Sequence, residues 1–369
     1  MCKDQTEAAK AVMPKEGDRG LSERERLGLA NKPLLAWYHG NARELPWREN
    51  PQPYRVWISE IMLQQTRIEA VKPYFDRFMR EIPGVAELAE VEDDRLMKLW
   101  EGLGYYNRAR NLKKAAQQIV LDYGGEMPLC YRELVKLPGV GSYTAGAIAS
   151  IAFGEAVPAV DGNVLRVVSR ILASREDILK QPTRRRIEAL LAETMPKQDA
   201  GSFNQGIMEL GETICLPKGK PRCEECPLAK LCLAFHEELT DVIPVKSPPP
   251  KRRCEKRTVC ILEYQGQIGL RKRKGTGLLA SLYELPNAEG HLLPGQLAAA
   301  FGLASEDILA CEPLPTAKHI FSHVEWYMVG YRVCLAKGMP KEYIRAEKEE
   351  LKATYPLPNA FARYTKLIK

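Results

Sequence analysis

The period of the hydrophobic pattern changes once along this chain of 369 residues, and that change limits the folds open to it. Through residues 56–79 (VWISEIMLQQTRIEAVKPYFDRFM), apolar side chains recur three and four positions apart, as on one face of a helix. Residues 258–273 (TVCILEYQGQIGLRKR) instead alternate on either side of Gly266, which is typical of a β-hairpin. The sequence therefore predicts two domains, an all-helical one followed by a smaller α/β or α+β one.

Helical spacing recurs along the first part of the chain, and we expect about ten helices there. The further segments that show it are 92–102, 107–122, 143–153, 163–173, 184–194 and 203–214. In the second part, residues 319–335 are expected to form paired strands and residues 293–303 a helix. The predicted organisation is a disordered tail at 1–27, a helical domain at 28–239, a linker at 240–257 and the mixed domain at 258–369.

The predicted linker, TDVIPVKSPPPKRRCEKR, contains three consecutive prolines, which stiffen and extend a chain. Its basic residues permit contact with phosphate groups, although a plain spacer is an equally good interpretation. The whole chain carries a net charge of +7, which allows a polyanionic partner without requiring one. The sequence has no apolar run long enough to span a membrane and no apolar core in its N-terminal segment, so we expect neither a membrane span nor an export signal.

Residues 137–141 read LPGVG and lead directly into a helix expected to start near Ser142. Glycine at positions 139 and 141 lets another backbone or a phosphate approach the main-chain N–H groups closely. The following helix adds free amides and the positive end of its dipole. With a helix at about 131–136 in front, the segment forms a helix–hairpin–helix, which suits a nucleic-acid phosphate because it reads no bases. An ordinary helix–helix turn is the alternative.

Two carboxylates, Glu60 and Asp161, are expected in contrasting surroundings. On a helix, three of the four residues nearest to Glu60 are apolar, and desolvation would raise its pKa. Asp161 precedes a helix expected from about Asn163, and as an N-cap it would stay ionised because the helix dipole lowers its pKa. A carboxyl that keeps its proton beside one that stays charged can cleave a glycosidic bond. The structural alternatives are a capping or ion-paired glutamate and a plain N-cap aspartate.

Four of the ten cysteines fall close together in the pattern C-x7-C-x2-C-x5-C. They are Cys215, Cys223, Cys226 and Cys232. In a chain without an export signal, such a cluster predicts a metal site rather than a disulfide framework. Four thiolates hold either zinc or a 4Fe-4S cluster, and the spacing alone does not separate these two. The loop between the first two cysteines, LPKGKPR, would present a basic surface.

These segments together resemble a known enzyme family. The stretch LPGVGSYTAGAIASIAFGEAVPAVDGNVLRV (137–167) is similar to the helix–hairpin–helix and Gly/Pro…Asp segment of DNA glycosylases. LPWR (45–48), SEIMLQQTR (59–67) and GLGYYNRARNL (102–112), followed by the cysteine cluster, resemble adenine DNA glycosylases of the MutY type. The resemblance extends from about residue 33 to the end of the chain. It implies an all-α helix–hairpin–helix glycosylase domain with a 4Fe-4S cluster and an α/β Nudix-like C-terminal domain.

The resemblance also implies a function in base excision repair. The enzyme would hydrolyse the N-glycosidic bond of adenine mispaired with 8-oxoguanine or guanine, which requires flipping the base out of the duplex. Its partner would be double-stranded DNA that contains such mispairs. We expect a monomer in the cytoplasm of a prokaryote, associated with the nucleoid, because no organelle signal is visible.

The resemblance assigns a role to each candidate residue. Glu60 would protonate adenine N7, and Asp161 would stabilise the sugar cation as an ion or through a transient covalent bond. Tyr143 and Asn163 would organise these groups. The residues implied for the adenine pocket are Arg43, Leu45, Trp47, Arg48, Leu63 and Ile68. Those implied to contact DNA or the opposite base are Gln65, Thr66, Leu103, Tyr105, Gly139, Gly141, Phe321, Ser322 and His323.

Tyrosine at position 143 bears on the product. Related glycosylases of the endonuclease III type carry a lysine there, which forms a Schiff base and permits strand cleavage, whereas tyrosine cannot. The sequence therefore predicts a monofunctional enzyme that leaves an abasic site. The C-terminal domain lacks the Glu-rich REx2EExG helix of Nudix hydrolases, so we expect no pyrophosphate hydrolysis.

Two positions depart from the family pattern. The family has six residues between its first two cysteines, and this chain has seven, which costs little loop-closure entropy. Gln205, expected near the adenine pocket, is glutamate in some relatives. Two rival functions are a pyrimidine-specific glycosylase, disfavoured by the LPWR and FSH segments, and a non-catalytic DNA-binding protein, disfavoured by the presence of Glu60 and Asp161.

Overall fold

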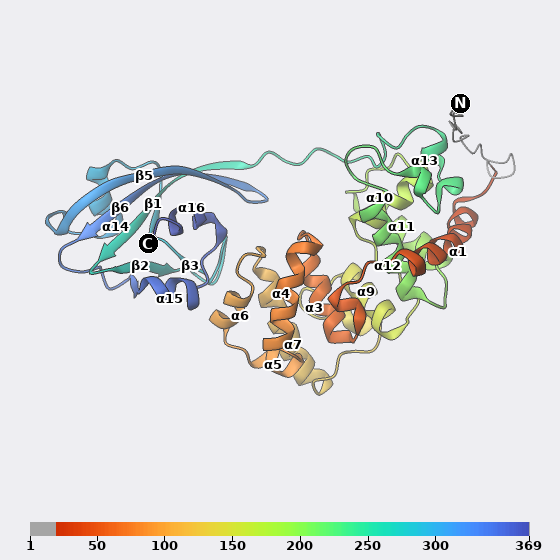
Figure 1. The fold of residues 1–369 in the computed structure, drawn as a ribbon, viewed down its shortest axis with the longest axis horizontal. Coiled ribbons are helices and arrows are strands. Elements are labelled where there is room, and N and C mark those ends of the chain that lie inside the picture. Colours follow the sequence, from red (N-terminus) through yellow and green to blue (C-terminus); the bar gives the residue numbers. More distant parts are fainter. Residues whose placement is uncertain (1–19, 369) are drawn as a thin grey trace, which may run out of the picture. The chain divides into compact units, whose positions relative to one another are not determined.

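The computed structural model describes residues 20–368, and these form two compact units (Figure 1). The first unit contains residues 20–79, Gly84–Ala86 and Lys114–Pro248, and the second contains Arg80–Pro83, Glu87–Lys113 and residues 249–368. Within the described residues, no helix has both the length and the apolar character needed to cross a membrane.

Helices make up nearly all of the regular structure up to residue 236, as the hydrophobic period predicted. They are α1 Glu23–Asn41, α2 Pro46–Glu49, α3 Pro53–Leu63, α4 Ile68–Glu81, α5 Val85–Glu90, α6 Asp93–Leu99, α7 Asn107–Tyr123, α8 Tyr131–Leu134, α9 Ser142–Phe153, α10 Gly162–Ile171, α11 Gln181–Thr194, α12 Ala200–Thr213 and α13 Leu233–His236. Several of these helices are single turns, which hydrophobic periodicity does not detect.

The first helix begins earlier than the sequence predicted. Ser22 accepts a hydrogen bond from the N–H of Glu25, while the Glu25 side chain accepts one from the N–H of Ser22. This reciprocal capping satisfies two backbone donors and starts a helix at Glu23. The predicted tail at 1–27 is therefore wrong for its last residues, and residues 1–19 lie outside the described part.

The continuous helical pattern at 56–79 becomes two helices, α3 and α4. The chain turns between them at Gln65, whose φ of 59° lies in the left-handed region. A periodic pattern does not reveal such a break, because the apolar residues on both sides still face the interior. The turn has a consequence for the site, since it directs Gln65 and Thr66 toward the same cavity as Glu60.

The core of the first unit packs α1 against α10, α11 and α12. Large buried side chains from these helices, among them Leu34, Val168, Leu191 and Phe203, belong to one apolar cluster. Burial of each such side chain stabilises the fold by roughly 1.5–3 kcal/mol. Helix α3 packs on α9, and α9 on α12, so the helices that carry the predicted site residues are fixed to this core.

The second unit is built on a mixed sheet. Its strands are β1 Arg253–Tyr264, β2 Gln267–Lys272, β3 Tyr283–Glu284, β4 Asn287–Glu289, β5 Ile308–Ile320, β6 Val324–Leu335 and β7 Ile344–Ala346. The order is β3-β2-β1-β6-β5, with β4 paired to β1 and β7 to β2. Only β1 and β6 pair in parallel. The α-helices between β4 and Ile368 are α14 Leu297–Phe301, α15 Lys348–Ala353 and α16 Ala362–Thr365.

The sheet confirms the hairpin predicted around Gly266, since β1 and β2 pair antiparallel there. The paired strands expected within 319–335 are confirmed in part, because β5 ends at Ile320 and pairs antiparallel with β6, which begins at Val324. The sequence did not predict the rest of β5, from Ile308 onward. In addition, β1 begins at Arg253, inside the segment expected to be a linker, because its backbone pairs with β6 from that residue onward.

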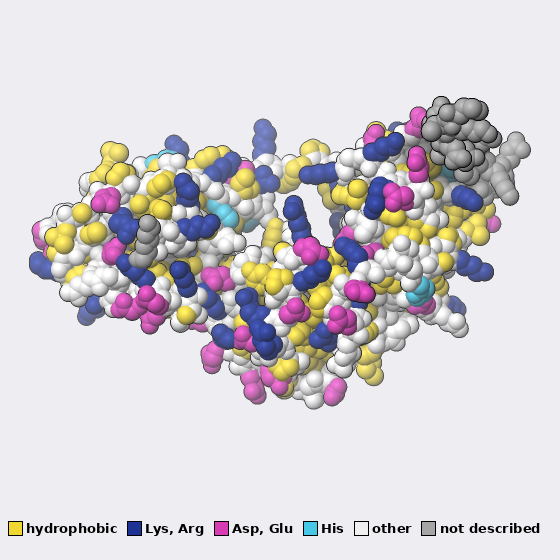
Figure 2. Space-filling view, in the orientation of Figure 1, with side chains coloured by type: hydrophobic (Ala, Val, Ile, Leu, Met, Phe, Trp, Pro, Cys, Tyr) yellow, Lys and Arg dark blue, Asp and Glu magenta, His cyan; other side chains and the backbone are white. Residues whose placement is uncertain are grey.

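The positive charge of the chain is not concentrated on one side of the face shown in Figure 2. Lys and Arg side chains form several groups there, and Asp and Glu side chains lie between them. Many of the surface charges are paired, as in the ion pairs Lys136–Glu133 and Arg24–Glu193. Net charge alone therefore does not locate an interface, and the site has to be built from individual residues.

Candidate active site

The first unit contains a cavity of about 820 Å3. Its wall is formed by α2, α3, α9, α10 and α12 together with the turns beside them. The residues predicted from the sequence that lie on this wall are Arg43, Leu45, Trp47, Arg48, Glu60, Leu63, Gln65, Thr66, Ile68, Gly141, Tyr143, Asp161 and Asn163. The structure thus brings both predicted carboxylates and the whole predicted adenine pocket to one place.

Glu60 lies on α3 with only 6% of its surface exposed. Burial raises the pKa of Glu60 to about 7, and the negative charges of Asp161 and Glu212 act in the same direction. The hydrogen bond from Tyr143 and the charge of Arg48 oppose this shift. The dry environment expected from its apolar neighbours is confirmed, and a large fraction of Glu60 keeps its proton at neutral pH.

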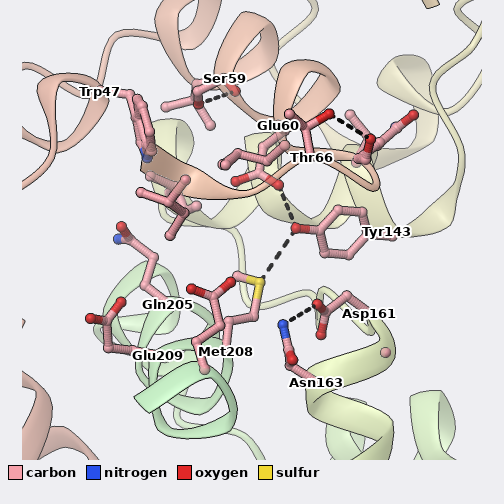
Figure 3. A pocket seen from close by; sticks show the side chains of 18 of the residues that line it. Trp47, Ser59, Glu60, Thr66, Tyr143, Asp161, Asn163, Gln205, Met208 and Glu209 are labelled. Carbon is pink, nitrogen blue, oxygen red and sulfur yellow. Dashed lines mark hydrogen bonds between the residues drawn. The ribbon is translucent and has the colours of Figure 1, made fainter. Parts of the chain in front are cut away.

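Tyr143 is the second residue of α9 and lies beside Glu60. Its hydroxyl donates a hydrogen bond to Oε2 of Glu60 and is 3.4 Å from the sulfur of Met208. Burial keeps the pKa of Tyr143 well above its usual range, so the phenol remains a hydrogen-bond donor. Figure 3 shows the tyrosine ring between Glu60 and Asp161. One residue of α9 therefore contacts the acid and lies close to the second carboxylate.

Asp161 is the N-cap of α10, as the sequence predicted. Its Oδ1 accepts a hydrogen bond of 2.8 Å from the N–H of Val164, and its Oδ2 accepts one of 2.9 Å from the Asn163 side chain (Figure 3). The expectation that the helix end lowers its pKa is wrong in direction. Burial raises the pKa of Asp161 above its usual value, and the hydrogen bonds oppose this only in part.

The segment before Asp161 is held rigidly by two neighbouring helices. Asn204 of α12, which is 1% exposed, accepts a hydrogen bond from the N–H of Ala159 and donates one to the carbonyl of Val157. On the other side, α9 approaches so closely at Gly146 that a Cβ there would lie 2.4 Å from the carbonyl oxygen of Pro158. Asp161 is therefore positioned by backbone packing as well as by its cap.

Several residues of the cavity wall were not expected there from the sequence, among them Gln64, Met208, Glu209 and Glu212. Glu209, whose side chain is 1% exposed, accepts hydrogen bonds from Arg43 at 3.0 Å and from Arg48 at 2.8 Å. For the last three, the available signal was helical spacing along 205–212, which places Met208, Glu209 and Glu212 on one face of a predicted helix. That signal does not say which face meets a cavity.

The glycine turn precedes α9 as expected. Gly139 has a φ of 77°, a conformation that favours glycine, and Gly141 is the N-cap of α9. Helix α8 lies immediately before the turn, so the segment has the predicted helix–hairpin–helix order. Gly141 lies on the cavity wall, and Gly139 is outside it. Phosphate binding at this turn stays a prediction.

The remaining predicted DNA contacts lie in the second unit, around a cavity of about 960 Å3. They are Leu103, Tyr105, Phe321, Ser322 and His323. The hydroxyls of Tyr105 and Ser322 are 3.1 Å apart. Arg108 supports the loop that carries Tyr105, because it donates hydrogen bonds to the carbonyls of Leu103 and Gly104 and stacks 5.7 Å from the Tyr105 ring.

None of the four clustered cysteines forms a disulfide within the described residues. Burial raises the pKa of Cys226 and Cys232 to about 12. Arg170 of α10 donates a hydrogen bond of 3.2 Å to Sγ of Cys215. Four thiols beside a cation are a donor set that fits a thiolate-bound metal centre. Across residues 20–368, no three or more His, Cys, Asp and Glu side chains are arranged to hold a single metal ion.

Comparison with known proteins agrees with both parts of the fold. Residues 58–196 match the HhH-GPD superfamily of base excision DNA repair proteins, and residues 258–367 match the NUDIX domain. Among solved structures, the chain is similar to a thermostable thymine-DNA glycosylase (TM-score 0.51, 30% identity, 58% of this chain and 97% of that one). It is also similar to endonuclease III in a non-covalent DNA complex (TM-score 0.51, 26% identity, 59% and 99%).

The similarity to curated proteins extends over most of the chain. Adenine DNA glycosylase of Mus musculus is 35% identical over 362 residues, which cover 82% of this chain and 70% of the mouse protein. That of Arabidopsis thaliana is 38% identical over 347 residues, which cover 79% of this chain and 55% of the plant protein. Since the chain is 35% identical to the mouse protein and covers 70% of its length, it belongs to the adenine DNA glycosylase family.

Proposed function

We propose that this protein hydrolyses the N-glycosidic bond of adenine paired with 8-oxoguanine or guanine in double-stranded DNA, leaving an abasic site. The observation that carries the proposal is one cavity that holds the buried Glu60, whose pKa is raised to about 7, together with the capped carboxylate of Asp161. Because Glu60 is 6% exposed, a base stacked in a duplex cannot reach it, and the adenine nucleotide has to flip into the cavity.

The first step is proton transfer to the leaving base. Glu60 donates its proton to N7 of adenine, which makes the neutral base a better leaving group as the bond between C1′ and N9 breaks. A pKa of about 7 suits this role, since the acid form is populated at neutral pH while the proton is still easily given up. Tyr143 holds the Glu60 carboxyl in place through its hydrogen bond.

The second step concerns the sugar. Loss of adenine leaves positive charge on C1′ and the ring oxygen, and Asp161 stabilises it either as an ion or through a transient covalent bond. The hydrogen bonds from Val164 and Asn163 favour the charged form of Asp161, which this step requires. Water then adds to C1′, so the products are adenine and an abasic site. With tyrosine at 143, no Schiff base forms and the strand stays intact.

The same proposal gives the other predicted residues a role in contacting the DNA duplex. The glycine turn at 139–141 and the amides at the start of α9 bind a phosphate without reading sequence. Tyr105, which is 49% exposed on its supported loop, fills the space left by the flipped nucleotide. Phe321, Ser322 and His323 contact the 8-oxoguanine of the pair.

We further propose that Cys215, Cys223, Cys226 and Cys232 hold a 4Fe-4S cluster. When bound, the cluster ties together the segment after α12 and the two short turns that follow it. The guanidinium of Arg170, which donates a hydrogen bond to Sγ of Cys215, would balance part of the negative charge of the bound cluster. Purified protein is expected to be yellow-brown, with about four iron atoms per chain. A colourless protein that contains zinc would contradict the assignment.

A nicking assay on three duplexes tests the reaction itself. The duplexes contain adenine opposite 8-oxoguanine, adenine opposite thymine and thymine opposite guanine. We expect breaks only in the first duplex and only after alkali, because the enzyme leaves an abasic site. Cleavage of the thymine:guanine duplex would instead support a pyrimidine glycosylase, the activity named for the structurally similar thermostable protein. Breaks without alkali would refute the monofunctional mechanism.

A further inference from the structure

Glu212 is a fourth carboxylate on the wall of the active-site cavity, and the reaction proposed above does not use it. It lies near the end of α12, in register with Gln205, Met208 and Glu209 at spacings of three and four residues. All four side chains line the same cavity, so α12 presents one face to the substrate site. The position of Glu212 on that face is not explained by packing, because its side chain is 36% exposed.

The side chain of Glu212 is held by a single cation. Its Oε2 lies 2.6 Å from Nη2 of Arg43, and the same guanidinium is shared with the buried Glu209. Glu209 also binds Arg48, so that its charge is matched by two arginines. The two arginines and two glutamates carry no net charge together, but Glu212 has only a share of Arg43, so its carboxylate is paired less closely than that of Glu209.

Glu212 is also close to the part of the site where positive charge develops. The preceding residue, Gly211, packs against the start of α10, where an added Cβ would lie 2.7 Å from Cβ of Asn163. The carbonyl of Gly211 accepts a hydrogen bond of 2.8 Å from Arg166. This close contact between α12 and α10 brings Glu212 to the side of the cavity that carries Asp161.

We propose that Glu212, held by Arg43, is a positioning residue whose charge keeps Glu60 in its acid form and favours the cationic sugar; this rests on the function proposed above. The charge of Glu212 raises the pKa of Glu60, in agreement with the first part of this role. It also raises the pKa of Asp161 and so opposes ionisation of that carboxyl, which means that Glu212 favours the sugar cation by its own charge and not through Asp161. The other charged or titratable groups on the wall are Arg43, Arg48, Arg67, Tyr143, Arg184 and Glu209.

The test is Glu212→Gln, which keeps the size of the side chain and an oxygen for Arg43 but removes the charge. Single-turnover excision of adenine opposite 8-oxoguanine is measured against pH. We expect the fall in rate on the alkaline side to begin at a lower pH than in the wild type, because Glu60 loses its proton earlier. The rate on the acidic plateau should fall by up to about tenfold, as the sugar cation loses a favourable charge. A profile that superimposes on the wild type would overturn the proposal.

Two variants separate this effect from structural damage. Glu212→Asp retains the charge. In this variant, the fall in excision rate on the alkaline side (the alkaline limb of the profile) should begin closer to its wild-type pH. Glu193→Gln makes the same charge change at a surface ion pair with Arg24 and should leave the profile unchanged. If Glu193→Gln moves the profile as far as Glu212→Gln does, net charge rather than this site is responsible, and the proposal is wrong.

A measurement without DNA distinguishes failure of this inference from failure of the proposed reaction. The carboxyl band of Glu60 is titrated by difference infrared spectroscopy, with Glu60→Gln used to identify the band. Glu212→Gln should lower the midpoint of this titration whatever the substrate proves to be. Wild-type protein that is inactive on every adenine duplex would refute the reaction. An unmoved midpoint would refute the role of Glu212.

Discussion

In the proposed reaction, Glu60 acts as an acid because its surroundings raise the pKa of its carboxyl to about 7. Burial on α3 opposes ionisation of Glu60, and its pKa of about 7 predicts how the excision rate depends on pH. Because this pKa is raised, the acid form is complete well below pH 7 and is lost as the pH rises through about 7. The single-turnover excision rate should therefore be highest on the acidic side and fall above neutrality.

Replacement of the acid tests the same residue directly. Glu60→Gln cannot donate a carboxyl proton, and we expect the single-turnover rate to fall by about 10²–10⁴-fold while affinity for the mispaired duplex is kept. Glu69→Gln, an exposed change on α4, provides a matched comparison and should retain full activity. Wild-type rates in Glu60→Gln would exclude Glu60 as the proton donor.

Tyr143 shifts the same equilibrium in the opposite direction from Glu212. Its hydroxyl donates to Glu60 and thereby lowers the pKa of that carboxyl. Tyr143→Phe removes this bond, so the pKa of Glu60 should rise and the alkaline limb of the rate profile should move to higher pH. The plateau rate should fall as well, because the carboxyl is then less well oriented. A limb that moves to lower pH would show that the hydroxyl does not act on Glu60 in this way.

The contact between α9 and the segment before α10 depends on one glycine. A methyl group at position 146 would meet backbone atoms of Pro158, which cannot move aside as a flexible side chain can. Gly146→Ala should destabilise the fold by about 1–3 kcal/mol and reduce excision, because Pro158 belongs to the segment that positions Asp161. Denaturant unfolding and single-turnover rates measure the two effects.

The comparison for this variant is Gly28→Ala on α1, where no atom lies within 4 Å of an added Cβ. That exposed helical position should gain roughly 0.5–1 kcal/mol, since alanine favours a helix over glycine. If both glycine variants changed stability alike, helix propensity rather than the contact with Pro158 would account for the result.

The sequence predicted those elements whose signals are local. The helix expected at 107–122 is α7, Asn107–Tyr123, and the aspartate before α10 is its cap as expected. Most of strand β5 was missed because its sequence, ILACEPLPTAKHI, contains two prolines and lacks clean alternation. Its position at the edge of the sheet tolerates those prolines, and long-range pairing with β6 forms it.

The same limit applies to the site. Glu60 was identified because its apolar neighbours lie in the same helix, so that its environment could be inferred locally. Glu209 and Glu212 could not be identified, since the arginines that bind them lie 161 to 169 residues away in the chain. The pKa of Asp161 was misjudged for the same reason. Its burial comes from helices packed in three dimensions, whereas the helix end that it caps is visible in the sequence.

Arg170, which lies on α10 and is 5% exposed, binds both the start of the cysteine loop at 215–216 and the segment at 240–243. It donates hydrogen bonds to the carbonyls of Thr240 and Ile243 at 2.8 Å and of Leu216 at 3.0 Å, in addition to its bond to Cys215. One guanidinium thus joins the cysteine loop to the chain that continues into β1. Arginine suits this role because its planar fork directs several donors at fixed angles.

Arg170→Met keeps the apolar stem and removes every donor, so several buried carbonyls lose their partner. Each such carbonyl costs about 1–3 kcal/mol, and we expect a total loss of at least about 3 kcal/mol in the free energy of unfolding. Limited proteolysis should also cut the chain at 240–252 much faster than in the wild type, because this exit segment is no longer anchored. Arg175→Met, an exposed change just beyond α10, should leave both measurements unchanged. Equal protease resistance in Arg170→Met and the wild type would mean that the bridge Asp177–Val245 and the bonds of Ser247 to Asp177 hold the exit segment by themselves.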